Sequence, residues 1–113
     1  MEHINKIELK GRIGTVRSNT FNDNNVANFT LVTELLYKNR NGEPMSDTTW
    51  FNVVAWEGKE IQNVKNIEKG MAVHVTGRMR STKFTNTEGV DRQYYEVLAT
   101  KLRIITEEEA SGQ

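Results

Sequence analysis

Aromatic and cationic side chains lie near one another at several points of the sequence, a combination suited to binding flat rings joined by anionic groups. Every nucleobase offers a π-face on which an aromatic ring can stack, and lysine and arginine hold phosphate groups. The candidate stacking residues are Tyr37, Trp50, Trp56 and Phe84. The candidate phosphate contacts, which lie close to these rings in the sequence or share a strand face, are Lys38, Lys59, Arg78, Arg80 and Lys83.

The two tryptophans belong to one strand-like run, residues 48–56. Trp50 and Trp56 are six residues apart, so strand geometry places both rings on one face, with Val54 between them. A tryptophan in a small β-barrel is more often part of the core than of a binding surface. Here the opposite face already supplies a core set, namely Phe51, Val53 and Ala55. We therefore expect the face that carries the tryptophans to be open to solvent.

Alternating apolar residues predict five strands, over residues 4–16, 26–37, 48–56, 71–80 and 93–105. Between the third and fourth strands, Ile61, Val64 and Ile67 recur at helical spacing and Gly70 follows. This pattern predicts a short amphipathic helix over residues 58–69 with a glycine stop. Clusters of turn-forming residues predict a polar loop and two turns, over residues 18–25, 39–44 and 86–89.

This order of elements favours an all-β fold, a five-stranded OB-fold barrel with one short helix between strands 3 and 4. An immunoglobulin-like sandwich is the alternative, but it would need more strands and no helix at that point. A chain of 113 residues is long enough for one domain with one modest core. We expect an OB-fold domain over residues 1–106 and a short acidic, flexible C-terminus over residues 107–113.

The composition argues against several kinds of chemistry. The sequence has no cysteine and two histidines, so we expect no disulfide, no thiol nucleophile and no metal site. No phosphate-binding glycine loop or paired carboxylates stand out, which predicts a binding protein that is not an enzyme and needs no cofactor. No apolar run reaches transmembrane length and the N-terminus does not resemble a signal peptide, so we expect a cytoplasmic protein without a membrane partner.

The charge distribution permits an anionic partner although the net charge is zero. Three of the 15 acidic residues lie within residues 107–113, so residues 1–106 carry 15 basic and 12 acidic residues, a net charge of +3. This is a mild excess, far from that of a protein that coats duplex DNA. Stacking should therefore contribute more of the affinity than charge does.

Taken in order along the chain, residues 4–105 resemble bacterial-type single-stranded-DNA-binding proteins. The matching segments are residues 5–14, 26–33, 49–56, 67–70, 73–80 and 83–84. The resemblance implies an OB-fold that assembles as a homotetramer, with a dimer possible, and wraps single-stranded DNA over aromatic platforms. The stacking positions of the family fall on Tyr37, Trp50, Trp56 and Phe84. Three of these rings depart from the commonest pattern, in which Trp stands at positions 37 and 84 and Phe at position 56.

The resemblance also implies a role in DNA replication, recombination or repair, in a bacterial, nucleoid-associated setting. Such a protein coats single strands without strong sequence preference. Many family members have a long tail with an acidic, apolar tip that recruits enzymes; residues 107–109 are acidic but no such tip follows, so we expect a short form without tail-mediated recruitment. Two alternatives stay open: a dimeric primosome-type OB-fold scaffold protein, and an OB-fold binder of RNA or oligosaccharide.

Overall fold

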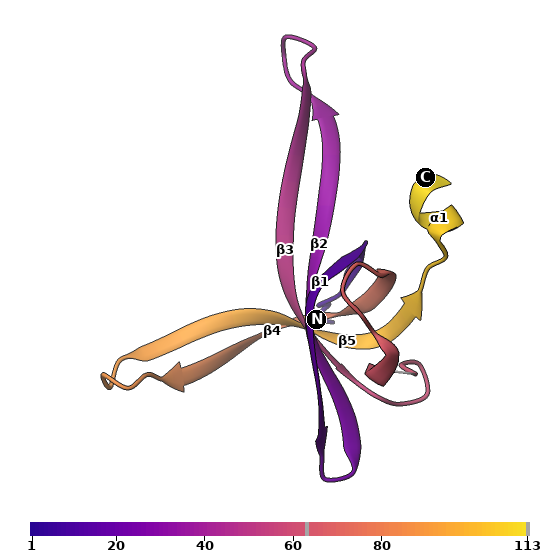
Figure 1. The fold of residues 1–113 in the computed structure, drawn as a ribbon. Coiled ribbons are helices and arrows are strands. Elements are labelled where there is room, and N and C mark those ends of the chain that lie inside the picture. Colours follow the sequence, from indigo (N-terminus) through magenta and orange to yellow (C-terminus); the bar gives the residue numbers. More distant parts are fainter. Residues whose placement is uncertain (63, 113) are drawn as a thin grey trace.

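The alternation of apolar and polar residues produces five long strands, which close into a barrel in the computed structural model (Figure 1). The structure describes residues 1–62 and 64–112. The strands are β1 (Ile7–Phe21), β2 (Asn24–Lys38), β3 (Pro44–Trp56), β4 (Ala72–Thr85) and β5 (Asp91–Ile104). Their order around the barrel is β1-β2-β3-β5-β4, and β3 pairs with β5 in parallel while the other pairs are antiparallel. The predicted five-stranded all-β barrel is confirmed.

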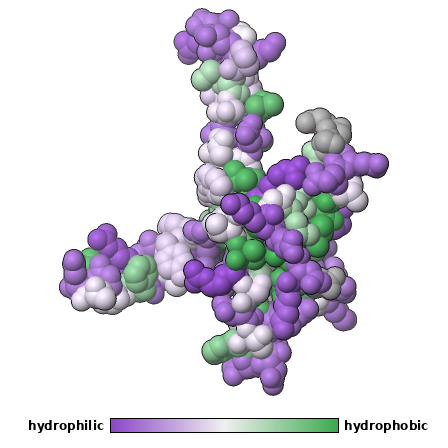
Figure 2. All heavy atoms as spheres, viewed as in Figure 1, coloured by the Kyte–Doolittle hydropathy of each residue, from purple (hydrophilic) through white to green (hydrophobic). Residues whose placement is uncertain are grey.

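The core is built from one face of each strand, because successive side chains of a strand point to opposite sides. Burying these side chains removes apolar surface from water, which is the main favourable contribution to folding. The largest fully buried side chains are Leu31, Val53, Val64, Val73, Val75 and Val97. The segments of the strands that extend past this core form hairpins that project from the barrel, and their tips are mostly hydrophilic (Figures 1 and 2).

The helix predicted between β3 and β4 is present as a single 3-10 turn, η1 (Val64–Asn66). Residue 63, inside the predicted helix, lies outside the described residues. Ile61, Val64 and Ile67 are buried and pack into the core, as their spacing predicted. The helix is short because its first residues bond to strands instead: Glu60 accepts a hydrogen bond from the Leu102 amide at 3.1 Å.

The polar loop predicted over residues 18–25 is wrong for most of its length. β1 continues to Phe21 and β2 begins at Asn24, so two residues make the turn. Asn22 and Asp23 have φ values of 51° and 65°, which are the left-handed values that a tight hairpin requires and that these two residue types tolerate. Polar strand residues on the exposed hairpin resembled loop composition. The turns predicted over residues 39–44 and 86–89 are confirmed.

A glycine in β4 allows β4 and β5 to approach each other closely. The register between β4 and β5 shifts between Thr76 and Gly77. A Cβ atom at Gly77 would lie 2.2 Å from the backbone carbonyl oxygen of Leu98, so the two strands approach too closely for any side chain at this position.

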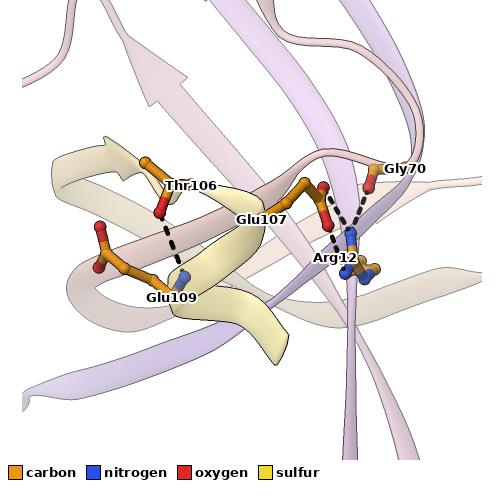
Figure 3. Close-up of polar contacts among 5 residues, drawn as sticks. All are labelled: Arg12, Gly70, Thr106, Glu107 and Glu109. Carbon is orange, nitrogen blue, oxygen red and sulfur yellow. Dashed lines mark hydrogen bonds and ion pairs between the residues drawn. The ribbon is translucent and has the colours of Figure 1, made fainter. Parts of the chain in front are cut away.

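The acidic C-terminus, expected to be flexible, forms helix α1 (Glu107–Gly112) against the barrel (Figure 3). The Thr106 hydroxyl accepts a hydrogen bond from the Glu109 amide at 3.2 Å, which caps the first turn. Arg12 of β1 donates to both carboxylate oxygens of Glu107 at 3.2 and 3.1 Å and to the Gly70 carbonyl at 3.0 Å. Arg103 of β5 pairs with Glu109 at 3.1 Å. Sequence reasoning missed this docking because Arg12 is distant in sequence from both Glu107 and Gly70.

The docking of α1 should weaken in acid. Hydrogen bonds from Arg12 lower the pKa of Glu107, and those from Arg103 lower the pKa of Glu109, below the ordinary value of 4.5. The ion pairs are therefore complete above pH 4.5 and are lost as pH falls through the lowered pKa. We expect hydrogen exchange at the Ala110 amide, which donates to Thr106, to accelerate over that range. Glu107→Gln should abolish part of this pH dependence.

Glu108→Gln is the matched control, because no cation pairs with Glu108 among the described residues. If Glu108→Gln and Glu107→Gln changed the exchange of Ala110 equally, the ion pairs would not hold the helix.

No helix of the described chain is both long and apolar enough to span a membrane.

Candidate nucleic-acid interface

Two indole rings lie on the outer surface of β3. Trp50 is 61% exposed and Trp56 is 39% exposed, whereas Val53 and Ala55, on the opposite face, are buried in the core. Trp50 pairs with Val32 of β2, and Trp56 pairs with Val26. The expectation that this face is open to solvent is confirmed for the two tryptophans, whereas Val54 between them is buried at 7% exposure. An exposed pair of large rings on a rigid strand is a platform on which flat ligands can stack.

Trp50 reaches across two neighbouring strands. A Cβ atom at Gly14 of β1 would lie 2.5 Å from Cζ3 of Trp50 and 2.6 Å from the hydroxyl oxygen of Thr30 of β2. The glycine therefore leaves the space in which the indole packs over β1. Thr30 is itself fixed, because its hydroxyl accepts a hydrogen bond from the Thr15 amide at 2.9 Å. The position of the ring is set by packing and not by a flexible loop.

A groove of about 340 Å³ crosses the sheet between the rows that carry the two tryptophans. The Thr30–Asn52 and Asn28–Val54 pairs separate the Val32–Trp50 pair from the Val26–Trp56 pair. The residues that line the groove come from β1, β2, β3 and β5, and more of them are polar than apolar: Thr15, Val16, Arg17, Asn28, Phe29, Thr30, Asn52, Val53, Val54, Tyr94 and Glu96. Such a groove offers both stacking surface and hydrogen-bonding groups to a ligand.

Phe84 and Tyr94 form an aromatic pair on the β4–β5 hairpin. Their ring centroids are 5.8 Å apart and the rings meet edge to face at 62°. Tyr94 is 42% exposed and also lines the groove, so it connects Phe84 to the tryptophan face. Sequence reasoning left Tyr94 unassigned. The signal was available, because a hairpin turning at residues 86–89 places Tyr94 opposite Thr82, diagonal to Phe84.

Arg80 is not a free cation. Its Nε donates to Oε1 of Glu96 at 2.8 Å, and Glu96 also accepts a bond from the Thr82 hydroxyl at 3.3 Å. Glu96 is a buried carboxylate, and Arg80 lies directly opposite it across the β4–β5 pair. The charge of Arg80 is therefore compensated within the protein. Arg17 at the groove and Arg92 opposite Phe84 are exposed cations that the sequence analysis did not select.

Some predicted site residues lie apart from the groove. Tyr37 pairs with Met45 and therefore lies on the opposite face of the β2–β3 hairpin from Trp50, although it is 51% exposed. Lys83 alternates with Phe84 and faces the other side of the β4–β5 hairpin. Lys59 lines a separate hollow with His74 and Lys101. The two remaining predicted cations are exposed, Lys38 at the end of the β2–β3 hairpin and Arg78 on the Phe84 face of β4.

Comparison with known proteins points in one direction. The sequence profile of the single-strand binding protein family matches residues 4–105. The single-stranded DNA-binding proteins of Neisseria meningitidis and Streptococcus mutans are 27% and 31% identical over 90% of this chain. The chain spans 60% and 62% of the length of these two curated relatives. A Plasmodium falciparum SSB, solved in complex with ssDNA, superposes with a TM-score of 0.80 at 26% identity, covering 94% of this chain and 98% of that one.

Proposed function

Because the chain belongs to the single-strand binding protein family, we propose that it binds and coats single-stranded DNA without strong sequence preference. The observation that carries this proposal is the exposure of Trp50 and Trp56 on either side of one groove. Base stacking on such rings tolerates any sequence, because every base has a π-face. The relatives are named as binding proteins, and coating of strands during replication, recombination or repair is the cellular role that we assign to the chain.

The residues that would stack bases and the cations that would hold phosphates lie on different parts of the surface. Trp50 and Trp56 flank the rows of the groove and Tyr94 of the Phe84–Tyr94 pair lines it, so these rings would hold bases along the groove. Tyr37 would stack a base on the opposite face of the β2–β3 hairpin. The cations left to hold phosphates are Arg17, Lys38, Lys59, Arg78, Lys83 and Arg92. Arg80 would act mainly through its ion pair with Glu96, by fixing the floor of the groove.

The proposal is tested by fluorescence titration with an oligothymidine. The two tryptophans should be quenched as binding saturates, and raising the salt concentration should weaken binding, because the cations that hold phosphates displace counterions from the strand. Measurable binding with unchanged tryptophan emission would refute the stacking mechanism. Competition with an RNA of equal length separates this function from that of an OB-fold RNA binder.

We also propose that the functional unit is a homotetramer in the bacterial cytoplasm. The proposal draws on family membership alone. The groove is lined by residues of a single chain, so its geometry gives no support for a second copy. Sedimentation or light scattering with and without oligothymidine measures the assembly. A dimer that loses DNA at moderate salt would instead favour the scaffold function.

Gly14→Ala should weaken oligothymidine binding about fivefold, through loss of part of the stacking energy of one base. The added methyl group would meet the ring of Trp50 at 2.5 Å, and the ring must move off the sheet to relieve the contact. Fluorescence titration measures the affinity, and near-ultraviolet circular dichroism reports the moved indole. In a Trp50→Ala background the same change should have no further effect on affinity. An equal effect in both backgrounds would mean that Gly14 acts independently of the ring.

A further inference from the structure

Phe21 is an exposed aromatic residue that the stacking surface described above does not include. It is the last residue of β1, it pairs with Asn24, and its side chain is 63% exposed. The two-residue turn at Asn22 and Asp23 keeps Phe21 in the strand. Phe21 adds nothing to the core, and with Val26 and Trp56 it forms an apolar surface patch, which is the kind of feature that marks a binding site.

Phe21 lies on the same face of the sheet as Trp56. Asn19, Val26 and Trp56 form one row across β1, β2 and β3, and Phe21 is two residues beyond Asn19. These residues and Thr20 line an open hollow of about 520 Å³ on the surface: Asn19, Thr20, Phe21, Val26 and Trp56. Val26 forms its apolar floor and is 6% exposed, and the two rings stand at its sides.

The hairpin beside the hollow is held in place by hydrogen bonds. The Thr20 hydroxyl donates to the Asn25 side-chain oxygen at 2.9 Å, and the Asn25 amide group donates to the carboxylate of Glu57. The Glu57 backbone amide in turn donates to the Asn25 carbonyl at 2.9 Å. Because Glu57 follows Trp56, this network fixes the hairpin relative to the indole. A site that is already ordered loses less conformational entropy when it binds a ligand.

We propose that this hollow holds one unpaired nucleobase between Phe21 and Trp56, so that the stacking surface continues past Trp56 onto the β1–β2 hairpin. The inference rests on the proposed function of binding single-stranded DNA. Among the described residues no cation lines the hollow, which suits a base and not a phosphate. Val26 and the two aromatic residues match the faces of a base, and the Asn19 side chain is compatible with its polar edge.

The test uses the chain with Trp50→Phe, which leaves Trp56 as the sole tryptophan, next to the hollow. In this background, Phe21→Ala should weaken oligothymidine binding about fivefold or more, since one stacked base is lost. Phe21→Tyr should keep the parent affinity. Phe21→Leu, which retains apolar bulk but no ring, should bind like Phe21→Ala.

The matched control is Leu36→Ala, because Leu36 is 77% exposed on another hairpin and has no ring. Its affinity should equal that of the parent, and the unfolding temperature of every variant should stay unchanged because the altered side chains are exposed. If Phe21→Ala bound as tightly as the parent, or Phe21→Leu restored binding, the inference would be overturned while the proposed function stood. Altered oligomeric state with unchanged DNA affinity would assign the hollow to a second copy of the chain. Absence of any binding by the unsubstituted protein would overturn both proposals.

Discussion

Trp50→Ala should lower the affinity for an oligothymidine by roughly one to two orders of magnitude. The indole is 61% exposed and would stack a base worth about 1–3 kcal/mol. The Val32–Trp50 row borders the groove rows on β2 and β3, so loss of the indole would remove the stacking surface at that end of the groove. Titration followed by a dye-labelled oligonucleotide measures the affinity independently of the lost tryptophan.

Two variants make this result specific. Trp50→Phe retains a ring and should keep most of the affinity, whereas Leu36→Ala removes exposed apolar area on the same face of the β2–β3 hairpin and should have no effect. The free energy of unfolding should change little in all three proteins, because neither side chain is buried. If Leu36→Ala weakened binding as much as Trp50→Ala, general apolar contact and not stacking would explain the interface.

Gly77→Ala should give a large loss of stability, about 3 kcal/mol. The new Cβ would lie 2.2 Å from the carbonyl oxygen of Leu98, which belongs to the backbone and cannot rotate away. The contact is at the crossing of β4 and β5, so relief requires moving a strand of the barrel. Because small domains are stable by only about 5–15 kcal/mol, denaturant unfolding should show a clearly lower midpoint.

Gly58→Ala is the matched control for this change. Nothing lies within 4 Å of a Cβ atom at Gly58, and its backbone is not in the left-handed region. The alanine variant should be as stable as the parent or slightly more stable, because alanine restricts the unfolded chain. Equal destabilisation by the two substitutions would show that the close approach at Gly77 has no energetic role.

Local patterns in the sequence predicted the barrel and the exposed tryptophans, because both depend on strand alternation. Phe51 to Ala55 supplied enough apolar residues for one buried face, which left the face of Trp50 and Trp56 to solvent. The alternation of apolar and polar residues does not predict how far a strand extends once it leaves the core, because its side chains there can be polar on both faces. The hairpin end containing Phe21 was therefore read as a loop, although its side chains simply have no core to face.

Pairing between distant strands accounts for what the sequence could not predict. The ion pair of Arg80 with Glu96 and the contact of Phe84 with Tyr94 both follow from the β4–β5 register. Without a register, Arg80 looked like a free cation and Tyr94 had no assigned neighbour. The position of Tyr37 depends on the β2–β3 register in the same way. The roles of these residues in DNA binding stay predictions until the variants are measured.

The parallel junction between β3 and β5 has a consequence for the dynamics of the barrel. In the described chain these strands pair only at Val53–Val97 and Val54–Leu98, whereas β2 and β3 pair along nearly their whole lengths. The β3–β5 junction should open locally more often than the others, with the fastest amide exchange of any strand junction. The groove is lined by residues of both β3 and β5, so a bound ligand would contact both strands and hold them together. The barrel would then open most easily at the place where the ligand binds, and binding would increase the stability of the closed barrel.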